Sequence, residues 1–199
     1  MVIKNNAFFF AVLFLFSSIF LSAGVLASES VLISEINYNP IGNPLDEYFE
    51  ITVRQNFGSD INTAGWTINT FDGEFNLTLP DIIDFGEFDY LSVRTGSGID
   101  DFDASDGSAT IYLGLSSDIL HDSGDEIALY DSNNNLIDFV RYNGGNSGIV
   151  LGGWNIADLG PIAITGESVQ IHGEDEDSSN NWLSGPPTEA NPNKLNMEI

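Results

Sequence analysis

The strongest constraint on the fold is a run of short alternating patterns, none of which reaches the length of a helix. Residues 31–68 contain two such patterns joined by a turn-rich link. Within Asp46–Gln55, the apolar side chains Phe49, Ile51 and Val53 alternate with polar ones. Because successive side chains of a strand point to opposite faces, this spacing predicts a half-buried β-strand.

Similar runs recur along the chain, and each is bounded by Gly, Pro, Asn, Asp or Ser. They cover Val31–Tyr38, Ala64–Thr70, Glu74–Leu79, Phe88–Thr95, Ala109–Gly114, Glu126–Tyr130, Leu136–Tyr142 and, as a final strand, Gly166–His172. The segment Asp131–Asn135 reads as a hairpin loop that pairs the two strands beside it. No amphipathic segment of helix length separates the strands, so the pattern predicts an all-β, antiparallel β-sandwich.

The first 27 residues differ from the rest of the chain. Lys4 precedes an apolar, Phe-rich run from Ala7 to Leu21, and small or modest residues end the segment at Ala27. This order is typical of a signal peptide, and we expect cleavage after Ala27. The apolar run is also long enough to serve as an uncleaved N-terminal anchor. Either way the sequence predicts a secreted or cell-surface protein, with one domain over residues 28–195.

Charge excludes several classes of partner. The chain has 30 acidic and 5 basic residues, for a formal net charge of −25, and its Lys and Arg residues are scattered singly. Such a surface repels nucleic acids and anionic lipids, so no nucleic acid is expected as a partner, and a membrane only if residues 1–27 remain as an anchor. The chain has no Cys, which excludes thiol redox chemistry and thiolate metal sites.

Several landmarks fall in the order found in one known family. Ile33–Pro40 reads ISEINYNP, and Gly65–Ile68 reads GWTI. Further on come SGDEIALYD at Ser123–Asp131 and IDFVRY at Ile137–Tyr142. Together these segments resemble the lamin tail domain family, in the form found in secreted prokaryotic proteins. The resemblance implies an immunoglobulin-like sandwich that acts as an interaction module, and it brings no catalytic residues with it.

Two acidic loops are candidates for a cation. The first, residues 100–107, offers Asp101, Asp103 and Asp106 as oxygen ligands for calcium, and the second is 174–180. Neither loop has the ligand spacing of an EF-hand, so a solvated acidic turn is the competing interpretation. The chain's two His residues show no zinc-binding spacing. We therefore expect no obligatory cofactor, with calcium as the alternative.

Catalysis has no recognisable signature. No Gly-x-Ser-x-Gly motif occurs, and with 30 acidic residues a pair of nearby carboxylates carries no information. Trp66 lies on an alternating pattern and is predicted to be in the core. Trp154 and Trp182 either pack over an end of the sandwich or stack on a sugar or a partner. The sequence favours a non-catalytic module that binds an unidentified protein or an envelope polymer. A calcium-stabilised carbohydrate-binding module is the alternative, and an acidic-residue hydrolase is a weaker one.

Overall fold

The structure is a computed structural model, and it describes residues 31–54, 60–71, 75–145, 147–158, 160–173 and 177–188. The predicted leader, residues 1–27, lies outside these ranges, as do 28–30 and 189–195 of the predicted domain. Within the described part, no helix is long and apolar enough to cross a membrane.

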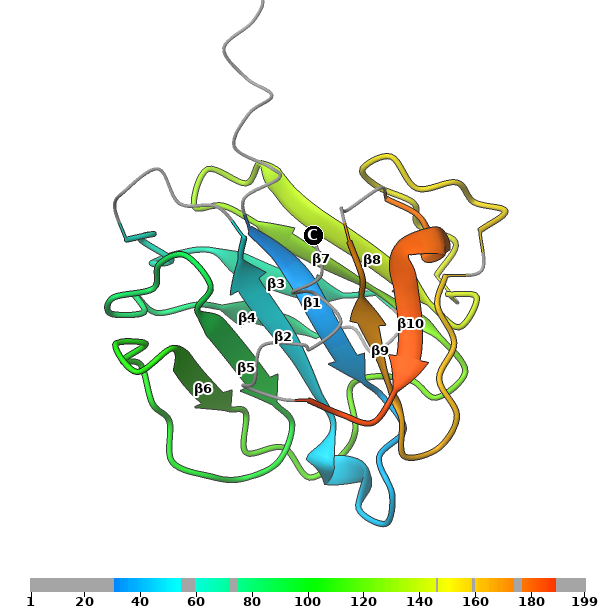
Figure 1. Cartoon of the computed structure of the whole chain (residues 1–199), viewed down its shortest axis with the longest axis horizontal. Helices are drawn as coiled ribbons and strands as arrows, with labels where there is room; N and C mark the ends of the chain where they lie inside the picture. The colour runs from blue at the N-terminus through cyan, green and yellow to red at the C-terminus, as the bar shows by residue number, and fades with distance from the viewer. Residues whose placement is uncertain are drawn as a thin grey trace, which may run out of the picture.

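Strands dominate the described chain (Figure 1). They are β1 (Val31–Asn37), β2 (Tyr48–Val53), β3 (Thr67–Thr70), β4 (Asn76–Thr78), β5 (Tyr90–Arg94), β6 (Ser108–Tyr112), β7 (Asp125–Tyr130), β8 (Leu136–Tyr142), β9 (Ser168–Ile171) and β10 (Trp182–Gly185). Two short 3-10 turns accompany them, η1 (Pro44–Asp46) and η2 (Ser179–Asn181). Each strand that the sequence predicts is present. Most are shorter than predicted, β8 has its predicted bounds, β6 and β7 each begin one residue earlier, and β10 was not predicted.

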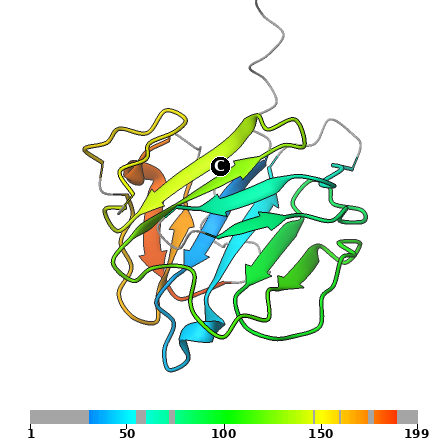
Figure 2. The same cartoon turned by 180° about the vertical axis from the view of Figure 1, so that it is seen from behind.

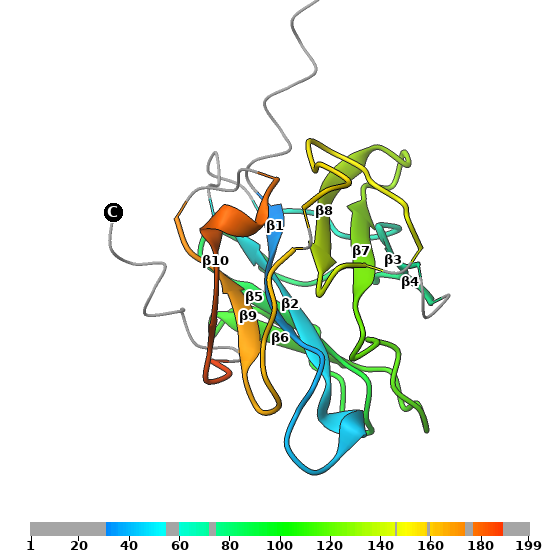
Figure 3. The ribbon, with the colours of Figure 1, turned by 90° about the vertical axis from the view of Figure 1, so that its right-hand side faces the viewer.

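The strands form two sheets that pack face to face. One has six strands in the order β10-β9-β1-β2-β5-β6, and the other has four in the order β4-β3-β7-β8. Figure 2 shows the four-stranded sheet in front, and Figure 3 shows the two layers from the side. The prediction of an all-β, immunoglobulin-like sandwich is therefore confirmed.

One strand pair departs from the antiparallel pattern. β5 and β6 pair in parallel, with Tyr90 opposite Ser108 and Arg94 opposite Tyr112. Parallel neighbours need a connection that returns the chain to the starting edge, and residues 95–107 provide it without a helix. This long connection contains the acidic loop that the sequence singled out.

The core lies between the two sheets. Cross-strand partners share a face, and the apolar members of β2 and β5, such as Ile51 and Leu91, meet those of β3 and β7, such as Ile68 and Leu129. Trp66, just before β3, belongs to this core and is 9% exposed. Its predicted inward position is correct.

The prediction of a half-buried β2 is wrong, because every residue of β2 is buried. Its polar side chains lie on the outer face of the six-stranded sheet, where Glu50 is opposite Glu35 of β1. Oε1 of Glu35 accepts hydrogen bonds from the hydroxyls of Tyr48 and Ser168, both at 2.6 Å. A polar network thus replaces solvent on this face, which alternation alone cannot reveal.

The outer face of the four-stranded sheet is also covered. Glu126 and Arg141 face each other on β7 and β8, with 3.6 Å between Oε1 and Nε. The Ser147 hydroxyl donates to Oε2 of Glu126 at 2.7 Å, and Nη1 of Arg141 donates to the Ile156 carbonyl at 2.9 Å. The chain after β8 is therefore fastened over this ion pair.

Candidate functional site

A row of three side chains crosses the outer face of the six-stranded sheet. Tyr48 of β2 is opposite Arg94 of β5, and Arg94 is opposite Tyr112 of β6. The guanidinium carbon of Arg94 lies 5.8 Å from the centroid of each tyrosine ring. Contacts at this distance are favourable cation–π interactions. The register of three strands therefore holds a cation between two aromatic rings.

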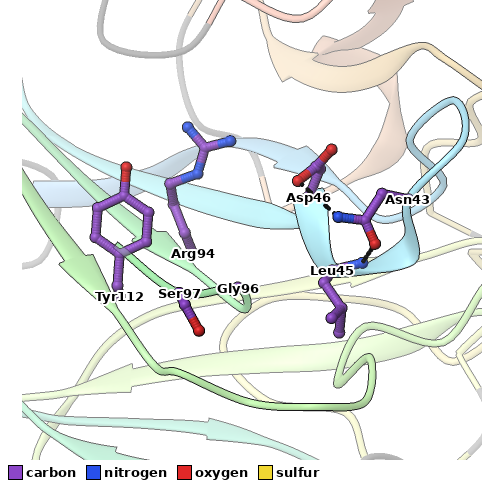
Figure 4. A pocket seen from close by; sticks show the side chains of 7 residues that line it. All are labelled: Asn43, Leu45, Asp46, Arg94, Gly96, Ser97 and Tyr112. Atoms are coloured by element: carbon purple, nitrogen blue, oxygen red, sulfur yellow. Dashed lines mark hydrogen bonds between the residues drawn. The ribbon is translucent and has the colours of Figure 1, made fainter. Parts of the chain in front are cut away.

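Beside this row lies a cavity of about 420 Å³ (Figure 4). It is lined by Asn43, Leu45, Asp46, Arg94, Gly96, Ser97 and Tyr112. These residues come from three parts of the chain: η1 with its cap, the end of β5 with the following loop, and the end of β6. The volume is in the range of small-ligand sites, although the lining is more polar than in most of them.

Local hydrogen bonds fix the wall formed by η1. Oδ1 of Asn43 accepts from the Leu45 amide at 3.1 Å, and Nδ2 of Asn43 donates to Oδ1 of Asp46, also at 3.1 Å. The Thr95 hydroxyl donates to the Leu45 carbonyl at 2.9 Å. Since Thr95 directly follows Arg94, this bond holds η1 against the end of β5. Asp46 is thereby held among the residues that line the cavity.

The opposite wall depends on two glycines. A methyl group on Gly96 would lie 2.7 Å from the Leu45 carbonyl oxygen, and one on Gly98 would lie 2.3 Å from the Tyr112 ring. Only glycine lets the loop approach this closely. The Tyr112 ring is therefore packed against the backbone rather than free to turn.

Figure 4 shows which groups point the same way: the Arg94 guanidinium, the Tyr112 hydroxyl and the Asp46 carboxylate. The Ser97 hydroxyl points in the opposite direction. The site therefore presents a donor-only group, an acceptor-only group and a hydroxyl that can do both. Sequence reasoning missed it, because η1 and the ends of β5 and β6 are brought together only by the pairing of the strands.

The buried carboxylate of Glu35 has a structural role. It is 0% exposed, and besides Tyr48 and Ser168 it accepts the Thr188 amide at 2.9 Å and the Thr188 hydroxyl at 2.6 Å. These hydrogen bonds compensate for the loss of hydration that burial of the side chain causes. Glu35 therefore ties the chain after β10 to the middle of the sheet and is closed to a substrate.

A second buried carboxylate, Glu47, lies at one end of the sandwich and is 1% exposed. Burial raises its pKa to about 8, although the amides of Leu120 and Ile119, which donate to Oε2 at 3.3 and 3.2 Å, favour the charged form. The negative charges of Asp118 and Asp122 raise the pKa further. A shifted carboxyl can mark a catalytic group, but this one is enclosed, so we interpret it as a structural acid.

The three calcium candidates lie in the connection between β5 and β6. Each carboxylate caps a nearby backbone amide: Oδ1 of Asp101 accepts from Asp103 and Oδ1 of Asp103 from Ser105, both at 3.0 Å, and Oδ1 of Asp106 accepts from Ser108 at 3.3 Å. The bonds from Ser105 lower the pKa of Asp103. Throughout the described residues, no three Asp, Glu or His side chains converge on a potential metal position. Calcium binding at Asp101, Asp103 and Asp106 stays a prediction, and Glu174 to Glu176 of the other acidic loop lie outside the described ranges.

The remaining tryptophans are buried rather than open to a ligand. Trp154 is 5% exposed and Trp182 is 6% exposed. The Trp154 ring meets the Phe139 ring edge to face, with 6.4 Å between centroids. Of the alternatives that the sequence leaves for these two residues, packing against the sandwich is confirmed. The prediction that either indole stacks on a sugar is wrong.

Comparison with known proteins agrees with this architecture. The family model described as Lamin Tail Domain matches residues 25–144, which span β1 to β8. No curated protein matches the chain. The match confirms the family resemblance read from the sequence, while β9 and β10 complete the six-stranded sheet beyond the matched region.

Proposed function

We propose that this chain, which belongs to the lamin tail domain family, is a secreted or cell-surface module that binds a partner protein or an envelope polymer without catalysing a reaction. The family is an immunoglobulin-like interaction module, which supports a non-catalytic role. The N-terminal pattern supports export. The net charge of −25 supports a soluble protein that avoids nucleic acid.

The observation that carries this proposal is the difference between carboxylates that are enclosed in the fold and polar side chains that line a cavity. Glu35 and Glu47 are enclosed and hydrogen-bonded within the fold. By contrast, Arg94, Asp46 and Tyr112 line a cavity that opens on the outer face of the six-stranded sheet. Asp46 is the one carboxylate among its lining residues. Hydrolysis by paired carboxylates needs two of them across one cleft, so the cavity suits binding.

Fractionation tests the location. The protein should be recovered from the medium or the cell surface, and protease added to intact cells should degrade the surface-held fraction. N-terminal sequencing then distinguishes cleavage after Ala27 from a retained anchor. Recovery of the full-length chain from the cytosol, with residues 1–27 present and no membrane association, would refute export.

Binding is tested with isolated cell envelopes of the host. Purified protein should co-sediment with them in a saturable manner, and it should release no product from polysaccharide or ester substrates. Absence of saturable co-sedimentation would count against a binding role at the surface. If the protein converted one of these substrates and Asp46→Asn abolished the turnover, the chain would be an enzyme and the binding-module interpretation would be wrong.

A further inference from the structure

We propose that the corner of the sandwich where β5 and β6 begin is a docking surface for a polypeptide segment that carries both Lys or Arg and large apolar side chains. The feature that points to it is a set of exposed apolar residues. Phe88 is 67% exposed, Ile83 is 56% exposed and Phe102 is 39% exposed. This corner lies at the start of β5, whereas the Arg94 cavity lies at its end. The inference therefore goes beyond the proposed function.

Two turns form this corner, and backbone hydrogen bonds hold them side by side. The Ile83 amide donates to the Phe102 carbonyl at 2.8 Å, and the Tyr90 amide donates to the Gly107 carbonyl at 3.1 Å. Phe88 lies between Ile83 and Tyr90 in the chain, so the two bonds fix both ends of its turn against the second turn. The exposed apolar residues thus belong to one region of the surface.

The fold itself gives no reason for an aromatic residue at position 88. Phe88 has a φ of +70°, a left-handed conformation that favours Gly or Asn and is strained for a bulky side chain. Because most of the residue faces solvent, its ring also gains little from burial. Strained backbone of this kind is concentrated at functional sites. An exposed ring in a strained conformation is explained if it packs against a partner.

Carboxylates beside these apolar residues determine the charge of the partner. Burial raises the pKa of Asp89. The negative charges of Asp60, Asp106 and Asp84 raise that pKa further, so the four carboxylates are close enough to repel one another. Asp84 and Asp89 each directly follow one of the exposed apolar residues. Lys or Arg side chains placed here would offset the repulsion, so the surface favours a cationic partner.

The same charges disfavour other kinds of partner. Nucleic acids and anionic membranes are repelled by a chain with 30 acidic and 5 basic residues. A single divalent ion fits less well, because no three Asp, Glu or His side chains converge on one point within the described ranges. A polypeptide can place several separate cations against the carboxylates while its apolar side chains pack against Phe88.

Titration of the purified protein with synthetic peptides, followed by amide chemical shifts, tests the docking surface. The probe is a heptapeptide with blocked ends that alternates Lys or Arg with Phe or Leu. One comparison peptide has Ser in place of Phe and Leu, and the other has Glu in place of Lys and Arg. The probe should shift the amides of residues 83–90 and 102–107. It should bind about tenfold more tightly than the Ser peptide, and the Glu peptide should not bind detectably.

Phe88→Asn separates binding from stability without changing the charge of the protein. Since Asn adopts the left-handed conformation more readily than Phe, this variant should melt at or above the wild-type temperature. It should nonetheless bind the probe about tenfold less tightly. The matched control is Ile156→Asn, because Ile156 is 65% exposed on the segment after β8. This control should bind as the wild type does.

The contribution of the carboxylates is measured with a second pair of variants. Asp84→Asn should weaken binding of the probe about threefold at about 0.15 M salt. Asp118→Asn removes the same charge from another exposed position. Asp118 acts on Glu47, whose carbonyl accepts the amide of Thr95 just after β5, so it lies at the other end of this strand. Asp118→Asn should therefore leave binding unchanged.

The docking surface is wrong if the probe does not bind or if the shifted amides lie elsewhere. It is also wrong if the Ser peptide binds as tightly as the probe, or if folded Phe88→Asn keeps the wild-type affinity, because net charge alone would then explain the attraction. Envelope co-sedimentation tests the proposed function separately, so the failure of one is distinguishable from the failure of the other.

Discussion

Two buried glutamates show how differently this fold accommodates a carboxylate. Glu35 accepts hydrogen bonds from Tyr48, Ser168 and Thr188, which come from three separate parts of the chain. Glu47 has two amide donors and lies among further acidic residues. The environment of Glu47 favours the protonated acid, because burial raises its pKa.

Glu47 should therefore make stability depend on pH. Its pKa rises from an ordinary 4.5 to about 8 in the folded protein. The folded state then binds the proton more tightly than the unfolded state does, so this contribution is fully present below pH 4.5 and is lost as the pH rises through about 8. Glu47→Gln should flatten this loss, which is on the order of a few kcal/mol since each pKa unit corresponds to about 1.4 kcal/mol.

Urea unfolding at pH 5, 6.5 and 8.5 checks the Glu47 prediction. Glu87→Gln, at an exposed position, is the control for removing one negative charge from the chain. If both variants change the pH dependence equally, general charge repulsion and not burial of Glu47 explains it.

A neighbouring pair of glycines tests the packing after β8. A methyl group on Gly145 would lie 2.2 Å from Oε1 of Glu126 and 2.4 Å from Nε of Arg141, whereas one on Gly144 would meet nothing within 4 Å. Both glycines have positive φ, +55° and +93°. Gly145→Ala should therefore cost at least about 2 kcal/mol of stability and Gly144→Ala about 1 kcal/mol. Equal losses of stability for the two variants in chemical denaturation would mean that backbone strain, and not contact with Glu126 and Arg141, sets the cost.

At the scale of elements, alternation predicted the strands well because it reports which side chains face the core. It failed for β10, since Trp182–Gly185 lies between an acidic loop and two prolines and has too few residues to show a period. Alternation also predicted that one face of β2 is exposed to solvent. The burial of that face depends on partners such as Ser168 and Thr188, more than a hundred residues away.

The candidate site was beyond prediction for a related reason. Tyr48, Arg94 and Tyr112 occupy paired positions on the outer face of three neighbouring strands. Their contact follows from the pairing of β2 with β5 and from the parallel pairing of β5 with β6. Strand order and register are long-range properties, and the parallel pair was not expected.

Packing of the irregular segments can be measured through the tryptophans. The glycine-rich setting of Trp154 predicts a smaller loss on truncation than for Trp66, but the structure buries both. Trp66→Ala and Trp154→Ala should each cost about 3–5 kcal/mol in urea unfolding. Trp154→Phe should cost much less, because it also removes a buried indole N–H that has no hydrogen-bond partner. A negligible loss for Trp154→Ala would place the segment before residue 158 outside the cooperative fold.

At the scale of the whole molecule, one contact joins β8, an edge strand of the four-stranded sheet, to β1 in the interior of the six-stranded sheet. Oδ2 of Asp138 on β8 accepts from the Ile33 amide of β1 at 2.6 Å. The chain as a whole has 30 acidic and 5 basic residues, so its stability depends on how salt screens its charges. Cations can act through screening or through a specific site, and the two make different predictions.

Melting at constant ionic strength in calcium, magnesium and chelator separates these effects. We expect a small and similar rise with both divalent ions, because Asp101, Asp103 and Asp106 each cap a backbone amide. A specific calcium site would add about 2.7 kcal/mol at a hundredfold excess over its dissociation constant. A calcium-selective rise of several degrees, lost when Asp101 and Asp103 are changed to Asn, would establish a site in this loop.

The central claim is that the molecule binds its surface partner through the outer face of the six-stranded sheet, at the Arg94 cavity. The most direct measurement compares saturable co-sedimentation with cell envelopes for the wild type, Arg94→Gln and the control Glu87→Gln, which lies before β5 and thus at its other end. Arg94→Gln should lower the affinity at least tenfold while its melting temperature stays close to that of the wild type, and Glu87→Gln should bind normally. Undiminished binding by a folded Arg94→Gln protein would contradict the account.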